Sequence, residues 1–249
     1  TMKKLVVGNV SYWDYLINDQ IHIGKIEFKD LETIYFKNHL NKAKDTSSSK
    51  KESKLLSSIK IDKLNIENAS AIVYDGTKDS ILVSLKNTTI SIKDIVLDES
   101  SKSNLIPFNY KTINIAADSI FYKTSNYENI NLNHLLFEDQ TLTLHGFHYK
   151  NKYSKKEYES LLTIQRDYYD VTAEKLIINE LALGKENDSV VFKTNLISID
   201  KANAAIYRDK FEKKEDLRIK KLYSKVIREL PLKLTVDSVS VKNSSIEYS

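Results

Sequence analysis

The chain has 249 residues, of which 41% are hydrophobic and 29% charged, and its net charge of +4 is mildly basic. This length allows one large or two ordinary domains, and the charge fits an anionic partner without requiring one. The absence of cysteine excludes disulfides and thiolate chemistry. No run approaches the roughly 18 apolar residues of a membrane span, and the first residues lack the pattern of a signal peptide. The start at Thr1-Met2 leads us to expect a piece excised from a longer chain.

Five stretches share one pattern: apolar, polar, apolar, two polar, apolar, polar, apolar. Chance would give roughly one strict match in a chain of this composition. A strand has a side-chain period of two, so the extra polar residue would turn the second half onto the opposite face. A β-bulge absorbs that residue, so each stretch is predicted to be a bent strand with one apolar face. The stretches are Ile21 to Phe28, Ile59 to Ile66, Leu142 to Tyr149, Ile197 to Ala204 and Leu234 to Val241, with looser versions at Leu5 to Tyr12, Ile90 to Leu97, Ile130 to Phe137 and Val171 to Ile178.

Several stretches end in Asn or Asp, and an apolar residue followed closely by tyrosine comes soon after. Asn and Asp tolerate left-handed turn conformations, so each predicts a hairpin corner with the aromatic residue on the return strand. With five Gly and two Pro in the chain, polar residues must supply most of the turn chemistry. The corners are expected at Asp30, Asn68, Asn203 and Asn243.

Three segments depart from the strand pattern. Residues 38 to 56 carry too little apolar surface to order themselves and are predicted to be a flexible polar loop. Residues 154 to 167 begin with a capping serine and place Tyr158, Leu161 and Leu162 on one side, which predicts a helix. Residues 215 to 229 form a second amphipathic helix, which Pro231 stops.

Catalytic chemistry is not visible in the sequence, which lacks a His-Glu-x-x-His motif, a Gly-x-Ser-x-Gly motif and a glycine-rich phosphate loop. His145 and His148 would meet as metal ligands only through the bulge predicted at His145-Gly146, and a surface role is the commoner one for strand histidines. Carboxylates such as Asp62 and Asp200 are expected to shape bulges and turns. Lysines and arginines near residues 210 to 221 alternate with acids, as on a solvated helix. We therefore expect no enzymatic activity, no metal, no cofactor and no nucleic-acid partner.

The repeated strand unit, which ends in Ile-x-Tyr at Ile246 to Tyr248, is one of two recognisable features. The other is the helix-Leu-Pro-strand junction at Leu230-Pro231-Leu232. Through these features the chain resembles the AsmA-like family, which is TamB-related and belongs to the repeating β-groove, or bridge-like, lipid-transfer superfamily. Residues 117 to 123 are similar as well, and the resemblance covers most of the chain outside 38 to 56.

The resemblance implies a mainly β fold: an elongated, curved antiparallel sheet forming an open groove, or trough, with one or two short amphipathic helices. Residues 1–249 would then be a single β-groove segment of a longer, inner-membrane-anchored protein of the bacterial periplasm. Its implied role is to shield or transfer phospholipid acyl chains between the inner and outer membranes. A sheet with one apolar face must cover it with a helix, a second sheet or a ligand. The alternative is therefore a structural or interaction module, such as a closed β-sandwich of a cell-envelope protein.

The expected lipid-binding face consists of apolar residues from four of the bulged stretches. The extra polar residue in the middle of each stretch shifts the alternation by one position, and we call this shift the slip. It makes sense only if these residues share one face. They are Ile21, Ile23, Ile26, Phe28, Ile59, Ile61, Leu64, Ile66, Leu142, Leu144, Phe147, Leu234, Val236, Val239 and Val241.

Overall fold

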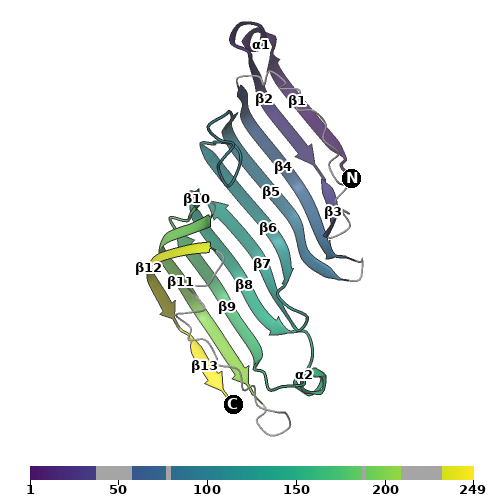
Figure 1. The fold of residues 1–249 in the computed structure, drawn as a ribbon, viewed down its shortest axis with the longest axis vertical. Coiled ribbons are helices and arrows are strands. Elements are labelled where there is room, and N and C mark those ends of the chain that lie inside the picture. Colours follow the sequence, from purple (N-terminus) through teal and green to yellow (C-terminus); the bar gives the residue numbers. More distant parts are fainter. Residues whose placement is uncertain (38–57, 77–79, 187–188, 209–231) are drawn as a thin grey trace. The chain divides into compact units, whose positions relative to one another are not determined.

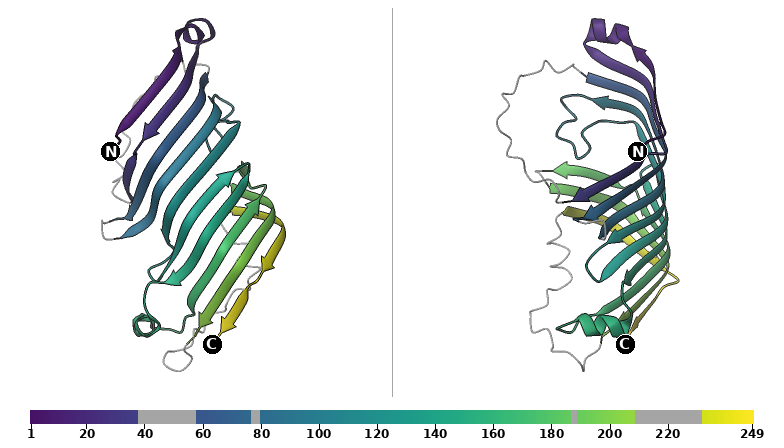
Figure 2. Two further views of the ribbon diagram at one scale, coloured as in Figure 1. Left: turned by 180° about the vertical axis from the view of Figure 1, so that it is seen from behind. Right: turned by 90° about the vertical axis from the view of Figure 1, so that its right-hand side faces the viewer.

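The computed structural model describes residues 1–37, 58–76, 80–186, 189–208 and 232–249. Within these ranges the protein is mainly β, with thirteen strands in a mixed sheet and two short helices (Figures 1 and 2). The predicted fold class is confirmed. The chain divides into two compact units: unit 1 is Thr1–Ser119 with Leu136–Asp139, and unit 2 is Ile120–Leu135 with Gln140–Ser249. The loop predicted at 38 to 56 and the helix predicted at 215 to 229 lie outside the described residues.

Unit 1 has the strand order β1-β2-β4-β5, and β3 lies along β4 beyond the end of β2. The pairs β1–β2 and β4–β5 are antiparallel, whereas β2 and β3 both run parallel to β4. These parallel pairs differ from the antiparallel sheet expected, and they make the sheet a mixed one. The elements are β1 (Lys4–Ser11), α1 (Tyr12–Asn18), β2 (Gln20–Lys29), β3 (Glu32–Lys37), β4 (Ser58–Asp75) and β5 (Ile81–Leu97).

Unit 2 has β8, β9 and β11 as antiparallel neighbours, and β10 is antiparallel to β11. The last two strands, β12 and β13, run parallel to β11. The boundary between the units falls within β6 (Thr112–Lys123) and β7 (Glu128–Glu138). The remaining elements are β8 (Thr141–Asn151), α2 (Lys155–Leu161), β9 (Tyr168–Asn179), β10 (Ala182–Glu186), β11 (Ser189–Tyr207), β12 (Leu232–Lys242) and β13 (Ser245–Tyr248).

The residues expected at hairpin corners do not reverse the strands. Asn68 has a φ of 53° inside the continuous strand β4, and Asn203 lies within the continuous strand β11. Asp30 and Asn243, each with a φ of 51°, separate β2 from β3 and β12 from β13, yet both strands of each pair stay beside the same neighbour. The hairpin prediction is wrong because the chain continues in the same direction beside the same neighbouring strand after each of these residues. Two-residue hairpins use type I′ or II′ turns, whose backbone reverses the chain.

The slip predicted in the middle of each stretch is present, but neighbouring strands share it. In unit 1 the pairing of β1, β2, β4 and β5 skips one residue on each strand, and the skipped residues lie at the same level. In unit 2 the pairing of β8, β9 and β11 does the same. At this level no strand has an extra residue relative to its neighbour, so the slip is not a bulge of two residues opposite one. The residues are Asn9, Gly24, Asp62 and Asp94 in unit 1, and Gly146, Glu174 and Lys201 in unit 2.

The helix α2 begins after Ser154, as predicted, and Ser154 and Glu157 form a capping box. It ends at Leu161 because Leu162 is already extended, with φ of −85° and ψ of 142°. β-Branched Thr163 and Ile164 follow, and such residues weaken helix formation. The helix buries Tyr158, which is 1% exposed.

Candidate functional site

The predicted apolar residues of unit 1 lie directly opposite one another on neighbouring strands. Ile23 on β2, for example, pairs with Ile61 on β4, which pairs with Ile95 on β5. Residues directly opposite in a sheet share a face, so these side chains form apolar rows across the strands. The rows are Ile21–Ile59–Leu97, Val10–Ile23–Ile61–Ile95, Val7–Ile26–Leu64–Ile92 and Leu5–Phe28–Ile66–Ile90.

Rows on the two sides of the shared slip belong to one face. Ile92 and Ile95 are 5% and 2% exposed, whereas Lys93 and Asp94 between them are exposed. In a regular strand, residues three apart point to opposite faces. Asp94, which has a φ of 53°, is the residue that restores the facing. We call the surface of these four rows apolar face 1.

Unit 2 repeats the arrangement. Leu142, Leu144 and Phe147 of β8 begin three rows, and Val239 and Val241 of β12 end two of them. The rows are Leu142–Ile178–Ile197–Val239, Leu144–Leu176–Ile199–Val241, Phe147–Ala173–Ala202 and Tyr149–Val171–Ala204–Ile246, and we call their surface apolar face 2. The other two predicted residues lie nearer the start of β12, with Leu234 opposite Phe192 and Val236 opposite Thr194.

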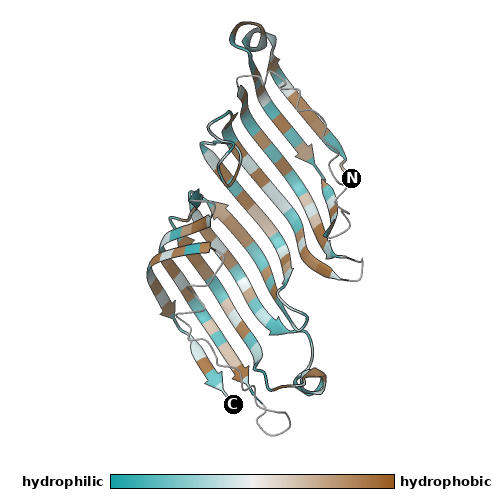
Figure 3. Ribbon diagram, in the orientation of Figure 1, coloured by the Kyte–Doolittle hydropathy of each residue, from teal (hydrophilic) through white to brown (hydrophobic). Residues whose placement is uncertain are grey.

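Several row residues were not among those predicted from the sequence. Those on β1, β5 and β9 come from stretches that match the pattern only loosely, and those on β11 come from a strict match. The alternation of apolar and polar positions in these stretches was the signal that could have included them. Figure 3 shows this alternation as brown and teal bands along the strands.

The described residues leave both apolar faces partly exposed. Leu234, Val239 and Val241 are 42%, 59% and 57% exposed, and the other predicted face residues are only partly buried. Monomeric proteins rarely leave a large contiguous apolar surface uncovered, and such a surface marks a binding site. Among the hydrophobic side chains of the described ranges, few are buried: Ile92, Ile95, Ala117, Tyr158, Leu162, Ala173, Leu181 and Val191.

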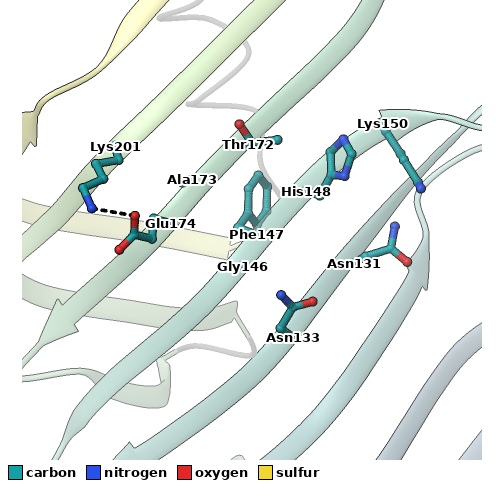
Figure 4. Close-up of a pocket in the computed structure, with 10 residues that line it drawn as sticks. All are labelled: Asn131, Asn133, Gly146, Phe147, His148, Lys150, Thr172, Ala173, Glu174 and Lys201. Atoms are coloured by element: carbon teal, nitrogen blue, oxygen red, sulfur yellow. Dashed lines mark hydrogen bonds and ion pairs between the residues drawn. The ribbon is translucent and has the colours of Figure 1, made fainter.

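A polar recess of about 530 Å³ lies in unit 2, where β7, β8, β9 and β11 carry its lining (Figure 4). Glu174 and Lys201 in its wall form an ion pair at 2.7 Å, and His148 Nε2 lies 2.7 Å from Asp170 Oδ1. The charges of Glu174 and Lys201 therefore compensate each other. The lining residues are Asn131, Asn133, Gly146, Phe147, His148, Lys150, Thr172, Ala173, Glu174 and Lys201.

The two histidines considered as metal ligands have different neighbours. The ring of His145 lies 6.3 Å from that of His134, centroid to centroid, whereas His148 is hydrogen-bonded to Asp170. Across the described ranges, no group of three or more His, Cys, Asp or Glu side chains is arranged to hold a metal ion.

The comparisons with known proteins find no match to this chain among family models, curated proteins or solved structures. The likeness to the AsmA-like family therefore rests on the sequence features alone. Neither helix in the described part of the chain has the length and apolar character needed to cross a membrane.

Proposed function

We propose that this chain is a non-enzymatic lipid-binding segment of an AsmA-like protein, in which apolar faces 1 and 2 shield phospholipid acyl chains. The protein would act in the bacterial periplasm, anchored in the inner membrane, and carry lipid between the inner and outer membranes. The observation that carries this proposal is the alignment of partly exposed apolar rows across the strands of each unit. Strands lie about 4.8 Å apart, so the rows make a continuous apolar surface along which a flexible acyl chain can lie.

A structural β-sandwich module is the competing function. A sandwich covers each apolar face with the apolar face of a second sheet. The described strands of each unit instead belong to a single layer. This observation argues against a second sheet as the cover of the two faces.

A charge placed on each apolar face tests the proposal. Leu64→Glu on face 1 and Val239→Glu on face 2 would set a carboxylate against acyl chains. If water can replace departing lipid, both variants should fold with a melting temperature near that of the parent, and lipid extracted from the purified protein should fall. In a sandwich the same carboxylate would be buried without a partner, which costs several kcal/mol and prevents folding.

Lys63→Glu and Thr235→Glu are the matched controls, because both residues are exposed and belong to the same strands, β4 and β12. They should retain both the fold and the bound lipid. A parent protein that carries no lipid, together with unfolded Leu64→Glu and Val239→Glu variants, would refute lipid binding and favour the structural module.

A further inference from the structure

The helix α1 turns its apolar side outward. Its sequence is Tyr-Trp-Asp-Tyr-Leu-Ile-Asn, and at about 100° per residue its five apolar and aromatic positions span an arc of about 200°. Asp14 and Asn18 occupy the remaining side. A surface helix normally buries its apolar stripe and exposes its polar side, so α1 is inverted. The exposed fractions are 77% for Tyr12, 73% for Trp13, 53% for Tyr15, 71% for Leu16 and 73% for Ile17.

The polar side of α1 is fastened to the sheet. His22 on β2 lies between two carboxylates, with Nδ1 3.2 Å from Asp14 Oδ2 and Nε2 2.9 Å from Asp62 Oδ1. The Ser11 hydroxyl caps the helix by accepting a hydrogen bond from the Asp14 backbone N–H at 3.3 Å. At the other end, Asp19 closes the helix in a left-handed conformation. The outward apolar side therefore belongs to a helix that is held at both ends.

The helix α1 lies at the end of the strands where the rows of apolar face 1 begin. Ser11, the last residue of β1, pairs with His22, and the adjacent rows of the face begin with Val10 opposite Ile23 and Ile21 opposite Ile59. Figure 1 shows α1 joining the ends of β1 and β2. A partner that binds α1 therefore lies beside the end of the strands where these rows begin.

We propose that α1 docks unit 1 onto the interfacial region of a lipid bilayer, where acyl chains enter or leave apolar face 1. The inference rests on the proposed function, because it supplies the contact between that face and its lipid. An arc of about 200° is twice the stripe of roughly 100° that a helix packs against a protein core, and a bilayer interface can surround it.

The side chains of α1 also match the chemistry of the interface. Tryptophan and tyrosine combine an apolar ring with one polar group and gather at the level of lipid headgroups. Leu16 and Ile17 supply purely apolar side chains for the acyl boundary. The helix has one acidic side chain, Asp14, and no basic residue in its last turn, so burial of apolar surface and not attraction to anionic lipid provides the affinity.

Trp13 is the only tryptophan of the chain, so its fluorescence reports on α1 alone. On addition of phosphatidylcholine vesicles we expect its emission to shift to the blue, acrylamide quenching to weaken and the protein to float with the vesicles. Leu16→Ser with Ile17→Ser should lower vesicle partitioning at least tenfold, because it removes two large apolar side chains from the contact. Leu183→Ser on β10 is the matched control, since Leu183 is 55% exposed and belongs to unit 2. Its partitioning should equal that of the parent.

Three results would overturn the docking proposal: an emission unchanged by vesicles, equal partitioning of the double variant and the parent, or a blue shift that appears with protein concentration alone. The last result would indicate self-association. Lipid extracted from the purified protein is measured in parallel, and circular dichroism checks the fold of each variant. A lipid-free protein that still binds vesicles through α1 would contradict the proposed function and leave the docking intact. A protein that carries lipid but does not bind vesicles would contradict the docking and leave the proposed function intact.

Discussion

The side chain of Asn9 on β1 occupies the space that a side chain at Gly24 on β2 would need, because a β-carbon at Gly24 would lie 2.7 Å from the Asn9 β-carbon. Unit 2 has the same relationship, with Asn133 on β7 filling the space over Gly146 on β8. Both glycines lie at the level of the shared slip. The slip in each unit is thus accompanied by an asparagine packed over a glycine.

Alanine at Gly146 should destabilise the protein by about 1–3 kcal/mol, because a β-carbon there would meet Asn133 and because alanine disfavours the φ of 62°. Gly184→Ala is the control, since no atom lies within 4 Å of its added β-carbon. It should leave stability unchanged or raise it by up to about 1 kcal/mol. Urea unfolding of both variants measures the difference, and equal losses at the two positions would contradict this account.

The hydrogen bond with Asp62, followed by that with Asp14, raises the pKa of His22 above its ordinary value of 6.5. A raised folded-state pKa means that the stabilisation is complete below about pH 6.5 and is lost as the pH rises through the folded pKa. The difference in melting temperature between the parent and His22→Gln should therefore be largest near pH 6 and shrink at higher pH. A difference in melting temperature that does not change with pH, or an NMR midpoint of His22 below 6.5, would refute the pairing of His22 with the two carboxylates.

At lower pH the opposite sign applies to Asp14. Hydrogen bonds from Ser11 and then His22 lower the pKa of this carboxyl below 3.8. Its contribution is present above the unfolded value and is lost as the pH falls through the folded pKa. Ser11→Ala should bring the NMR midpoint of Asp14 closer to 3.8, whereas a midpoint unchanged from the parent would show that the cap does not act on the carboxyl.

Tyr158 should contribute through its ring more than through its hydroxyl. The side chain is 1% exposed, and its ring centroid lies 5.4 Å from that of Tyr127 and 5.7 Å from that of Tyr168. Its hydroxyl makes only long hydrogen bonds, at 3.5 Å to Glu128 and 3.3 Å to the Asp167 carbonyl. Urea unfolding should show a loss of about 3–5 kcal/mol for Tyr158→Ala and at most about 1.5 kcal/mol for Tyr158→Phe.

Burial also raises the pKa of Tyr158 to about 12. An absorbance titration should therefore include one tyrosine that ionises near this pH and is missing in Tyr158→Phe. If Tyr158→Phe instead loses a tyrosine that ionises near the ordinary pKa of about 10, the hydroxyl is not buried.

Alanine substitutions can test which parts of the apolar rows are covered. Ile95 is 2% exposed, so Ile95→Ala should cost about 2–5 kcal/mol. Val239, at 59% exposed, should lose no more than about 0.5 kcal/mol on substitution by alanine when the protein has been stripped of lipid. Similar losses at both positions, measured by urea unfolding, would mean that face 2 is covered by protein.

Local patterns predicted a large part of this structure. The alternation with one slip placed Ile23 and Ile26 in neighbouring apolar rows, and Ser154 marked the start of α2. The slip was attributed to a bulge because one strand viewed alone shows an extra residue. Only the paired strands show that each neighbour carries one as well.

The facing of a side chain depends on its own backbone, and for this reason the sequence alone was enough to place Leu64 and Ile66 on one face of a strand. The neighbours of a strand depend on hydrogen bonds between distant segments, so only the tertiary structure decided that β2 and β12 run parallel to their partners. Asn68 has the same local chemistry whether its strand turns back or continues. Here β4 continues, because its residues after Asn68 pair with β3 and β5. Likewise Trp13 would suit a buried helix equally well. Its exposure follows from the fastening of Asp14 to His22, which turns the polar side of α1 toward the sheet.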